Sequence, residues 1–465
     1  HNTSTLLAHL LLHSNPFLSL PSSQYNHFPS STQSFLSSFS LHFPSTTTNT
    51  LFSYLGLSFY RIPTCFQYPT SLSLSLSLSL SLSLSLSLSL SLSLSLSLSM
   101  PSLSEAFKAD PVHVNITQLD LDSVKELPDT HAWPPLDDDS FDAESVPVID
   151  LTDPNVVTQI GHACETWGVF QITNHGLSMD LLNHVESQCR CLFSLPAQQK
   201  LKASRPPDGV TGYGLARISS FFSKIMWSEG FTIVGSPMEH ARKLWPDNYT
   251  QFCDVIEEYE KEMKKLAGRL MWLMLASLGM TEEDVKWAGP TGEFQDSSAA
   301  LQLNSYPACP DPNRAMGLAE HTDSPLLTIL YQSSTSGLQV LRDGGHGWVT
   351  VPPLEGALVI NVGDLLHILS NAQFRTVLHR AVVNRYQQRF SVAYLWGPPT
   401  HIQIAPFSKL ITANRPQLYR SITWTEYLSI KAKQFNKALN AVRLIPPLNL
   451  SIDTNNGHNS VEVGC

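Results

Sequence analysis

The chain is 465 residues long and acidic, with 29 lysines and arginines against 39 aspartates and glutamates and a formal net charge of −10 at pH 7. It contains no run of basic residues, which argues against nucleic acids and anionic membranes as partners. After Met100 no stretch of uncharged apolar residues is long enough to span a bilayer, so the sequence predicts no membrane anchor.

Residues 1–99 do not have the composition of a globular domain. They contain no Asp, Glu, Lys or Met, and residues 71–99 alternate Ser and Leu without interruption. As protein, this alternation would be an amphipathic strand that is prone to aggregate at a free edge. A repeated TC dinucleotide also translates as alternating Ser and Leu, and Met100 is the first methionine of the chain. We therefore expect residues 1–99 to be a translated untranslated leader.

A signal or transit peptide is the alternative for this segment, because it is rich in serine and free of acidic residues. However, it lacks both the arginines of a transit peptide and a compact apolar core with a basic flank. We expect the product to begin at Met100.

The cysteines indicate a reducing compartment. Six of the seven follow Met100, and their spacing fits neither a zinc ribbon nor a dense disulfide framework. We therefore expect a cytoplasmic protein. We also expect a monomer whose partner is a small molecule rather than a nucleic acid or a membrane.

The N-terminal half of this product is predicted to be mainly helical. Residues 100–145 are polar, acidic and proline-bearing, which predicts an arm lying on a domain. A helical and mixed region is expected over residues 146–296. Its first elements, predicted from hydrophobic period and from turn and capping residues, are a strand over 146–151, a helix over 156–167, a strand over 168–173 and a helix capped by Ser178 that stops before Pro196.

The character of the chain changes near residue 299. Before that point, residues 205–248 are rich in loops, and a long amphipathic helix is predicted from Thr250 to Leu278, closed by Gly279. Beyond it come short β-branched runs separated by turn residues. Eight short strands at such spacing predict a jelly roll or small barrel. They cover residues 300–306, 326–332, 337–341, 348–353, 357–363, 376–383, 389–396 and 401–406.

The predicted fold class is therefore α+β. We expect a double-stranded β-helix, of the jelly-roll or cupin-like kind, with flanking helices that include the long helix packed on the barrel. The β-barrel core is assigned to residues 297–404 and a helical segment to 405–447, with its helix over 423–442. A disordered tail is expected over residues 448–465.

Two polar residues interrupt the apolar stretch at residues 317–330. His321 and Asp323 are two residues apart, and on a strand such residues point to the same face, so that imidazole and carboxylate would converge. His379 lies in a later apolar run, VLHRAVV. Two imidazoles and one carboxylate make the facial triad that binds non-haem Fe(II) and leaves coordination positions open. Zinc is the main rival by ligand type, but a catalytic zinc site more often keeps only one open position.

Arg389 and Ser391, in the run QQRFSVAYL, would also share one face of a strand. An arginine that points into a barrel is a costly buried charge unless it has a partner. A carboxylate that binds both arms of the guanidinium fork would satisfy it. We therefore expect Arg389 to face the carboxylate of a ligand.

These residues carry a family resemblance. The order and spacing of His-X-Asp, a second His and Arg-X-Ser resemble the plant 2-oxoglutarate and Fe(II)-dependent dioxygenases. The segment LNSYPACPDP is similar to the Asn-Tyr-Tyr-Pro-X-Cys-Pro segment of that family, with Ser305 in place of the first Tyr. Further similar segments, from VPVIDL and WGVFQITNHG through NVGDLLHILSN to YLWGPP, extend the resemblance over nearly all of residues 146–400.

The resemblance implies a role for each of seven residues. The iron ligands would be His321, Asp323 and His379. The distal carboxylate of 2-oxoglutarate would be held by Arg389 and Ser391. The same cosubstrate would be contacted by Tyr306 and by Asn304, for which a purely structural amide is the alternative.

The resemblance also implies the chemistry. Fe(II), 2-oxoglutarate and dioxygen would be required, with ascorbate as reductant. 2-Oxoglutarate would be converted to succinate and CO2 while an unactivated carbon is oxidised.

Within the family, residues 220–237 and 303–343 are most similar to the branch that hydroxylates gibberellins, diterpenoid acids, at C-3. This expectation rests on resemblance alone. A cation for the gibberellin carboxylate could come from Lys224 or Arg217 in the loop-rich region, although either could equally be a surface residue.

Two other functions stay open. One is a related dioxygenase that acts on another gibberellin position or on a flavonoid. The other is a non-catalytic barrel that binds a small acid or a metal.

Overall fold

The structure is a computed structural model that describes residues 120–136, 145–207, 209–342 and 347–444. All of them belong to the unit Leu92–Cys465. The expected leader over residues 1–99, most of the expected arm over 100–145 and the expected tail over 448–465 lie outside the described residues.

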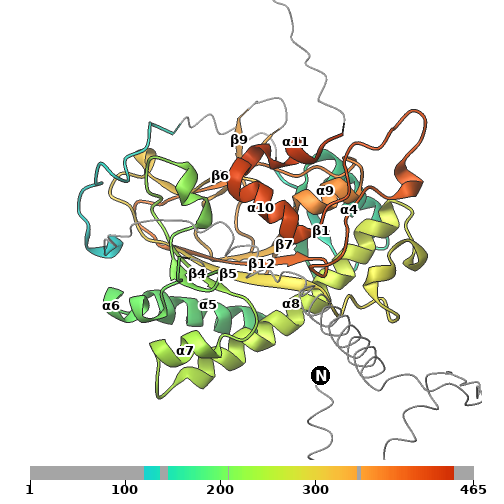
Figure 1. The fold of residues 1–465 in the computed structure, drawn as a ribbon. Helices are drawn as coiled ribbons and strands as arrows, with labels where there is room; N and C mark the ends of the chain where they lie inside the picture. The colour runs from blue at the N-terminus through green and yellow to red at the C-terminus, as the bar shows by residue number, and fades with distance from the viewer. Residues whose placement is uncertain (1–119, 137–144, 208, 343–346, 445–465) are drawn as a thin grey trace, which may run out of the picture. The chain divides into compact units, whose positions relative to one another are not determined.

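Two sheets form the core (Figure 1). The large sheet has eight strands in the order β1-β2-β10-β7-β12-β5-β4-β3, and the small sheet has four in the order β6-β11-β8-β9. The strands of the large sheet are β1 Val148–Asp150, β2 Val169–Thr173, β3 Gly212–Gly214, β4 Glu229–Ile233, β5 Ser298–Tyr306, β7 Leu327–Gln332, β10 Leu358–Val362 and β12 Arg389–Gly397. Those of the small sheet are β6 Met316–His321, β8 Leu338–Leu341, β9 Trp348–Thr350 and β11 His379–Val382.

Apolar runs explain the centre of the large sheet. Every residue of β7 and of β10 is buried, as expected for strands covered on both faces. The neighbouring strand β12 pairs with β5 along its whole length, from Arg389 opposite Tyr306 to Gly397 opposite Ser298. Only β1 and β2 pair in parallel; the other named pairs are antiparallel. The two sheets with their flanking helices confirm the predicted α+β jelly-roll class.

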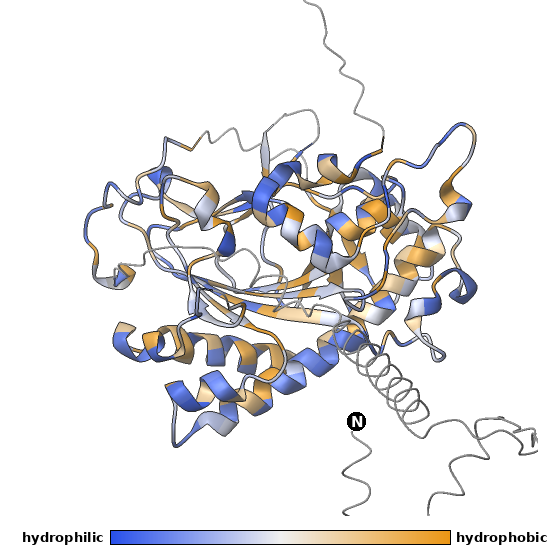
Figure 2. Ribbon diagram, viewed as in Figure 1, coloured by the Kyte–Doolittle hydropathy of each residue, from blue (hydrophilic) through white to orange (hydrophobic). Residues whose placement is uncertain are grey.

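Helices cover the outer face of the large sheet. The long helix α8, Tyr249–Ser277, contacts β7 and β12 as well as α4 Val156–Thr166, α5 Met179–Phe193 and α7 Met238–Leu244. In Figure 1, α5, α7 and α8 lie on the opposite side of this sheet from α10, Trp424–Gln434. Figure 2 shows hydrophobic and hydrophilic residues alternating along α8, as expected for a helix with one buried face. The long helix packed on the barrel is thus confirmed.

Capping residues act where the sequence predicts them. The Ser178 hydroxyl accepts a hydrogen bond from the Leu181 backbone N–H at 3.1 Å and so begins α5. Gly279, with a φ of +71°, follows the C-terminal end of α8.

The structure corrects the predicted elements at three points. The run over residues 401–406 is not a strand, since only Ile404 forms an isolated bridge, to Ile422. Its apolar alternation has another cause: Ile404 is buried, and Ile402 packs against the same core. The predicted helix over 423–442 is interrupted after α10 at Phe435, where φ is +48°; a short 3₁₀ turn and α11, Ala438–Val442, follow.

The third correction concerns elements that the prediction left out. The loop-rich region over residues 205–248 contains β3, β4, α7 and a 3₁₀ turn, η4, over Arg217–Phe221. Two short helices also lack a counterpart in the prediction: α6, Ala197–Lys200, and α9, Asp364–Leu369. Within the described ranges, no helix combines the length and the apolar character that crossing a membrane would require.

Gly168 allows a close approach between α4 and the chain before β11. Its φ is +70°, and a Cβ at this position would lie 2.4 Å from the Arg375 carbonyl oxygen. We expect Gly168→Ala to lower the free energy of unfolding by about 3 kcal/mol or more, because left-handed backbone strain of roughly 1–2 kcal/mol combines with a clash against the main chain.

Gly176 provides the matched control. Its φ is +94°, but a Cβ there would have no neighbour within 4 Å, so Gly176→Ala should lose only the strain component. Equilibrium denaturation of both variants measures the difference. Equal losses would show that the clash at Gly168 is absorbed by local movement.

Candidate active site

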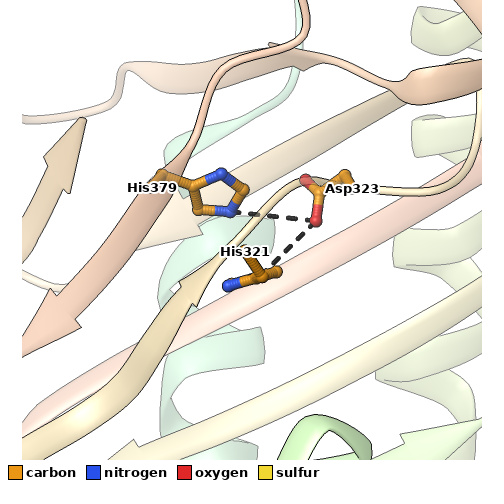
Figure 3. A group of neighbouring side chains, drawn as sticks. All are labelled: His321, Asp323 and His379. Carbon is orange, nitrogen blue, oxygen red and sulfur yellow. Dashed lines mark ion pairs between the residues drawn. The ribbon is translucent and has the colours of Figure 1, made fainter. Parts of the chain in front are cut away.

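Three side chains from two segments converge in the interior (Figure 3). His321, Asp323 and His379 each offer a ligand atom, and these atoms all lie within 4.8 Å of one another. Asp323 Oδ1 is 3.6 Å from His321 Nε2 and 3.8 Å from His379 Nε2. The structure therefore brings together the three residues that the sequence singles out as candidate metal ligands.

The convergence has a different cause from the one that the sequence suggests. The strand β6 ends at His321, and Asp323 lies in the loop that crosses from the small sheet to β7 in the large sheet. The expectation that both residues lie on one strand face is therefore wrong. Instead, β6 pairs with β11 so that His321 stands opposite His379, and the crossing loop brings Asp323 to the same point. Pro325 contributes to this break, because it offers no N–H to a ladder.

The rings are oriented by the backbone. His321 Nδ1 lies 2.9 Å from the Ala319 carbonyl oxygen, and His379 Nδ1 lies 3.2 Å from that of Val377. Since a carbonyl only accepts, each Nδ1 carries a proton, and Nε2 is the nitrogen of each ring that faces the cluster and can bind a ligand. Asn361 Nδ2 donates to Asp323 Oδ2 at 3.3 Å, which leaves Oδ1 directed at the imidazoles.

Electrostatics keep this cluster in the form that binds a cation. Burial, together with the neighbouring His379, lowers the pKa of His321 to about 4, so its ring is neutral at pH 7. Burial alone would raise the pKa of Asp323, but the two imidazoles and Asn361 lower it below its usual value. Two imidazole nitrogens and one carboxylate are the donor set of a facial triad and fit Fe(II).

A second group of polar residues lies on β5 and β12. Arg389 stands opposite Tyr306, and Ser391 stands opposite Asn304, whose amide nitrogen is 3.4 Å from the Ser391 hydroxyl. Arg389 is only 2% exposed, and its Nη2 donates to Gln332 at 3.1 Å. Its Nε is buried without a hydrogen-bond partner, and no carboxylate of the described residues forms an ion pair with it. A buried guanidinium in this state fits an anionic ligand.

Both groups line one cavity of about 290 Å³. Much of the remaining lining is apolar: η4 contributes Ile218 and Phe221, and α10 contributes Trp424 and Leu428, with Phe435 directly after it. Strand residues such as Leu330 and Leu338 complete it. Phe221 and Phe435 stack with ring centroids 4.7 Å apart, which joins η4 to the end of α10. Size and lining are those of a small-molecule site.

The two cations that the sequence suggests for a substrate carboxylate differ in position. Arg217 lines the cavity. Lys224 is absent from the lining, and its Nζ donates to the Asp129 carbonyl oxygen at 2.7 Å. The structure thus favours Arg217 over Lys224.

Sequence reasoning missed the polar residues that hold the ligands in place. Asn361 contacts Asp323, and Asp364 with Lys431 forms a buried ion pair beside the cluster. The segment NVGD contains two of them, but an isolated polar pair after a strand is also typical of a turn. For Lys431, the signal was its position one helical turn after Leu428, on the face of α10 that lines the cavity.

Two family models match the chain. Residues 297–398 match the 2OG-Fe(II) oxygenase superfamily, and residues 146–248 match the N-terminal region of the non-haem dioxygenase in morphine synthesis. The first match contains all seven residues discussed above as candidate metal and cosubstrate ligands.

Curated relatives cover the same part of the chain. Gibberellin 3-beta-dioxygenase 1 of Pisum sativum is 59% identical over 375 residues, which is 78% of this chain and 100% of that protein. Gibberellin 3-beta-dioxygenase 2 of Arabidopsis thaliana is 55% identical over 346 residues, which is 74% of this chain and 99% of that protein.

Solved structures agree in fold. JOX2 in complex with 2OG, Fe and JA matches with a TM-score of 0.61 at 31% identity, over 69% of this chain and 95% of that one. The dioxygenase for auxin oxidation 1 from Arabidopsis thaliana matches with a TM-score of 0.51 at 26% identity, over 58% of this chain and 100% of that one. With the two family models, these similarities show that the chain belongs to the 2OG-Fe(II) oxygenase superfamily.

Proposed function

We propose that this protein hydroxylates a gibberellin precursor at C-3, on the β face. As a member of its superfamily it is an Fe(II)- and 2-oxoglutarate-dependent dioxygenase that uses O2, with ascorbate as the expected reductant. The observation that carries the choice of substrate is the 59% identity to a gibberellin 3-beta-dioxygenase over the whole length of that relative. The products would be a 3β-hydroxylated gibberellin, succinate and CO2.

We assign the iron to His321, Asp323 and His379. Their two imidazole Nε2 atoms and single carboxylate support this role, because such a set leaves further coordination positions open to cosubstrate and dioxygen. When bound, the iron supplies dioxygen activation and removal of hydrogen from an unactivated carbon, coupled to oxidative decarboxylation of 2-oxoglutarate. The chain itself orients these ligands and lines much of the cavity beside them with apolar side chains.

The 2-oxoglutarate site is assigned to Arg389, Ser391, Tyr306 and Asn304. The guanidinium and the Ser391 hydroxyl would bind the distal carboxylate, and the Tyr306 hydroxyl would donate a further hydrogen bond to the cosubstrate. Fe(II) with one carboxylate ligand keeps one net positive charge, and Arg389 adds a second. This sum matches a dianionic oxoacid.

Arg217 is assigned to the carboxylate of the gibberellin. Arg217 lines the cavity next to the apolar side chains of η4, and its Nη2 also donates to the Gly209 carbonyl oxygen. Burial and the neighbouring Arg205 lower the pKa of Arg217 to about 9, so it is still protonated at pH 7. The apolar side chains of η4 and α10 would cover the hydrocarbon skeleton.

A product assay tests the proposal as a whole. The purified protein is incubated with Fe(II), ascorbate, 2-oxoglutarate and a panel of gibberellins and flavonoids, and products are identified by mass spectrometry. We expect 3β-hydroxylation of a gibberellin. Oxidation at another gibberellin position, or of a flavonoid alone, would overturn the choice of substrate, and absence of succinate release with every substrate would contradict the enzyme assignment.

Metal binding tests the iron ligands. We expect His321→Ala to weaken anaerobic binding of Co(II), a spectroscopic substitute for Fe(II), by about 100-fold or more, since one of three protein ligands is lost. His175→Ala is the control, because this buried histidine contacts the Gly356 carbonyl oxygen and lies outside the cluster. Titration followed by absorption spectroscopy gives both affinities, and equal values would refute the ligand assignment.

Cosubstrate kinetics test Arg389. We expect Arg389→Ala to raise the KM for 2-oxoglutarate by about 10- to 100-fold, the loss typical of charge-assisted hydrogen bonds. Arg385→Ala is the control, since this arginine is exposed and bonds to the Pro310 carbonyl oxygen. An unchanged KM in Arg389→Ala would remove Arg389 from the cosubstrate site.

Substrate kinetics test Arg217. Replacing it in Arg217→Gln should raise the KM for the gibberellin by about 10-fold while the KM for 2-oxoglutarate stays constant, because only the substrate carboxylate loses a charged partner. Lys224→Gln serves as the control outside the cavity. A loss that is the same in both variants, or confined to Lys224→Gln, would contradict the role of Arg217.

A further inference from the structure

The carboxylate of Asp364, the first residue of α9, is completely buried and accepts from four side chains. Its Oδ1 accepts from the Thr376 hydroxyl at 2.9 Å. Its Oδ2 accepts from the hydroxyls of Thr322 at 3.1 Å and Tyr427 at 2.8 Å, and it pairs with the Lys431 ammonium. A buried carboxylate with this many donors is held rigidly.

Two of these donors belong to the segments that carry the candidate metal ligands. Thr322 stands between His321 and Asp323, and Thr376 lies in the stretch that leads into β11. The backbone N–H of Asp364 also donates to the Asp323 carbonyl oxygen at 2.8 Å. One carboxylate thus joins both ligand-bearing segments to each other.

The backbone around Asp364 allows this close contact. Gly363 has no side chain, and a Cβ there would lie 2.0 Å from the Pro325 carbonyl oxygen. The Gly363 N–H donates to the Leu326 carbonyl oxygen at 2.9 Å, and the Leu365 N–H donates to that of Pro325 at 3.1 Å. The start of α9 therefore packs directly on the loop that carries Asp323.

Asp364 also balances a charge beside the cluster. The Lys431 ammonium reaches in from α10, lines the cavity and donates to the Thr322 hydroxyl at 2.7 Å. An unpaired ammonium in this low-dielectric interior would disfavour a divalent cation at the neighbouring ligands. The negative charge of Asp364 offsets it.

We propose that Asp364 is a positioning residue for the metal centre. It fixes the loop with His321 and Asp323 against the segment that leads to His379, and it neutralises Lys431 next to them. The inference rests on the proposed assignment of these three residues as metal ligands. Partners that act on a metal through its ligands typically contribute about 10- to 100-fold in affinity.

The test compares two buried lysine–carboxylate pairs. Asp364→Asn keeps the shape of the side chain and removes its charge, and Glu229→Gln does the same to the Lys200–Glu229 pair, whose charged atoms are 2.7 Å apart outside the cavity. Anaerobic Co(II) titration gives the affinity, and the d–d absorption bands report the ligand geometry. Asp364→Asn should bind Co(II) about 10- to 100-fold more weakly with shifted bands.

The control separates this effect from general destabilisation. Glu229→Gln should stay within about twofold of the parent in Co(II) affinity, as expected for a site that shares no partner with the cluster. Parent-like affinity and bands in Asp364→Asn would overturn the proposal. So would an equal loss of affinity in Glu229→Gln.

Milder variants keep the proposal testable where Asp364→Asn does not fold. Thr376→Val and Thr322→Val each remove one hydrogen bond to the carboxylate at nearly constant shape, and each should weaken Co(II) binding by about 3- to 10-fold. Parent-like binding in both would overturn the positioning role.

The double variant Asp364→Asn/Lys431→Met tests the charge. It should bind Co(II) more tightly than Asp364→Asn, because the unpaired ammonium is gone; no recovery would refute the neutralising role. A wrong assignment of the metal ligands can be distinguished from a wrong role of Asp364. In that case His321→Ala would bind Co(II) as tightly as the parent.

Discussion

The pairing of β6 with β11 is the interaction on which the site depends. It sets His321 opposite His379 in the small sheet, and the loop that follows must then cross to the large sheet, which carries Asp323 past the same point. Burial of these polar groups is costly unless each is satisfied. The backbone carbonyls of Ala319 and Val377 and the Asn361 amide meet that demand and at the same time orient the free lone pairs. The hydrogen bonds that satisfy these buried groups therefore also set the orientation of the candidate ligands.

The large sheet contributes a positive charge, whereas the cluster of His321, Asp323 and His379 contains a negative one. Arg389 is buried on β12 beside Tyr306, with an Nε that has no protein partner. An unsatisfied buried Nε lowers the stability of the fold, and a ligand that supplies an acceptor there restores that stability. The small sheet and the loop after β6 therefore offer two imidazoles and a carboxylate for a cation. The large sheet offers a guanidinium for the carboxylate of a ligand.

The sequence predicted the fold class and most strands because their hydrophobic period is regular. It also singled out the seven candidate ligands: polar residues in apolar strands point to five of them, and the family resemblance adds Tyr306 and Asn304. The prediction from sequence failed where side-chain contacts decide the course of the backbone. The strand assignment of Asp323 was wrong because the pairing partner of β6 cannot be read from its own residues, and the run over 401–406 is extended without a ladder. The role of Asp364 depends on Lys431 and Tyr427, which are distant in sequence.

The interruption of the last helix at Phe435 bears on how the protein is made. Phe435, Leu428 and Lys431 come from α10 and its end, whereas all seven candidate ligands precede them in the chain. Since a nascent chain emerges from its N-terminus, the wall formed by η4 and the ligand-bearing strands leave the ribosome before the part of the wall that α10 forms. A chain that ends before α10 would thus lack this part of the wall and leave the candidate ligands more exposed to water. Residues of α10 therefore complete the cavity wall only after the segments that carry the candidate ligands have been synthesised.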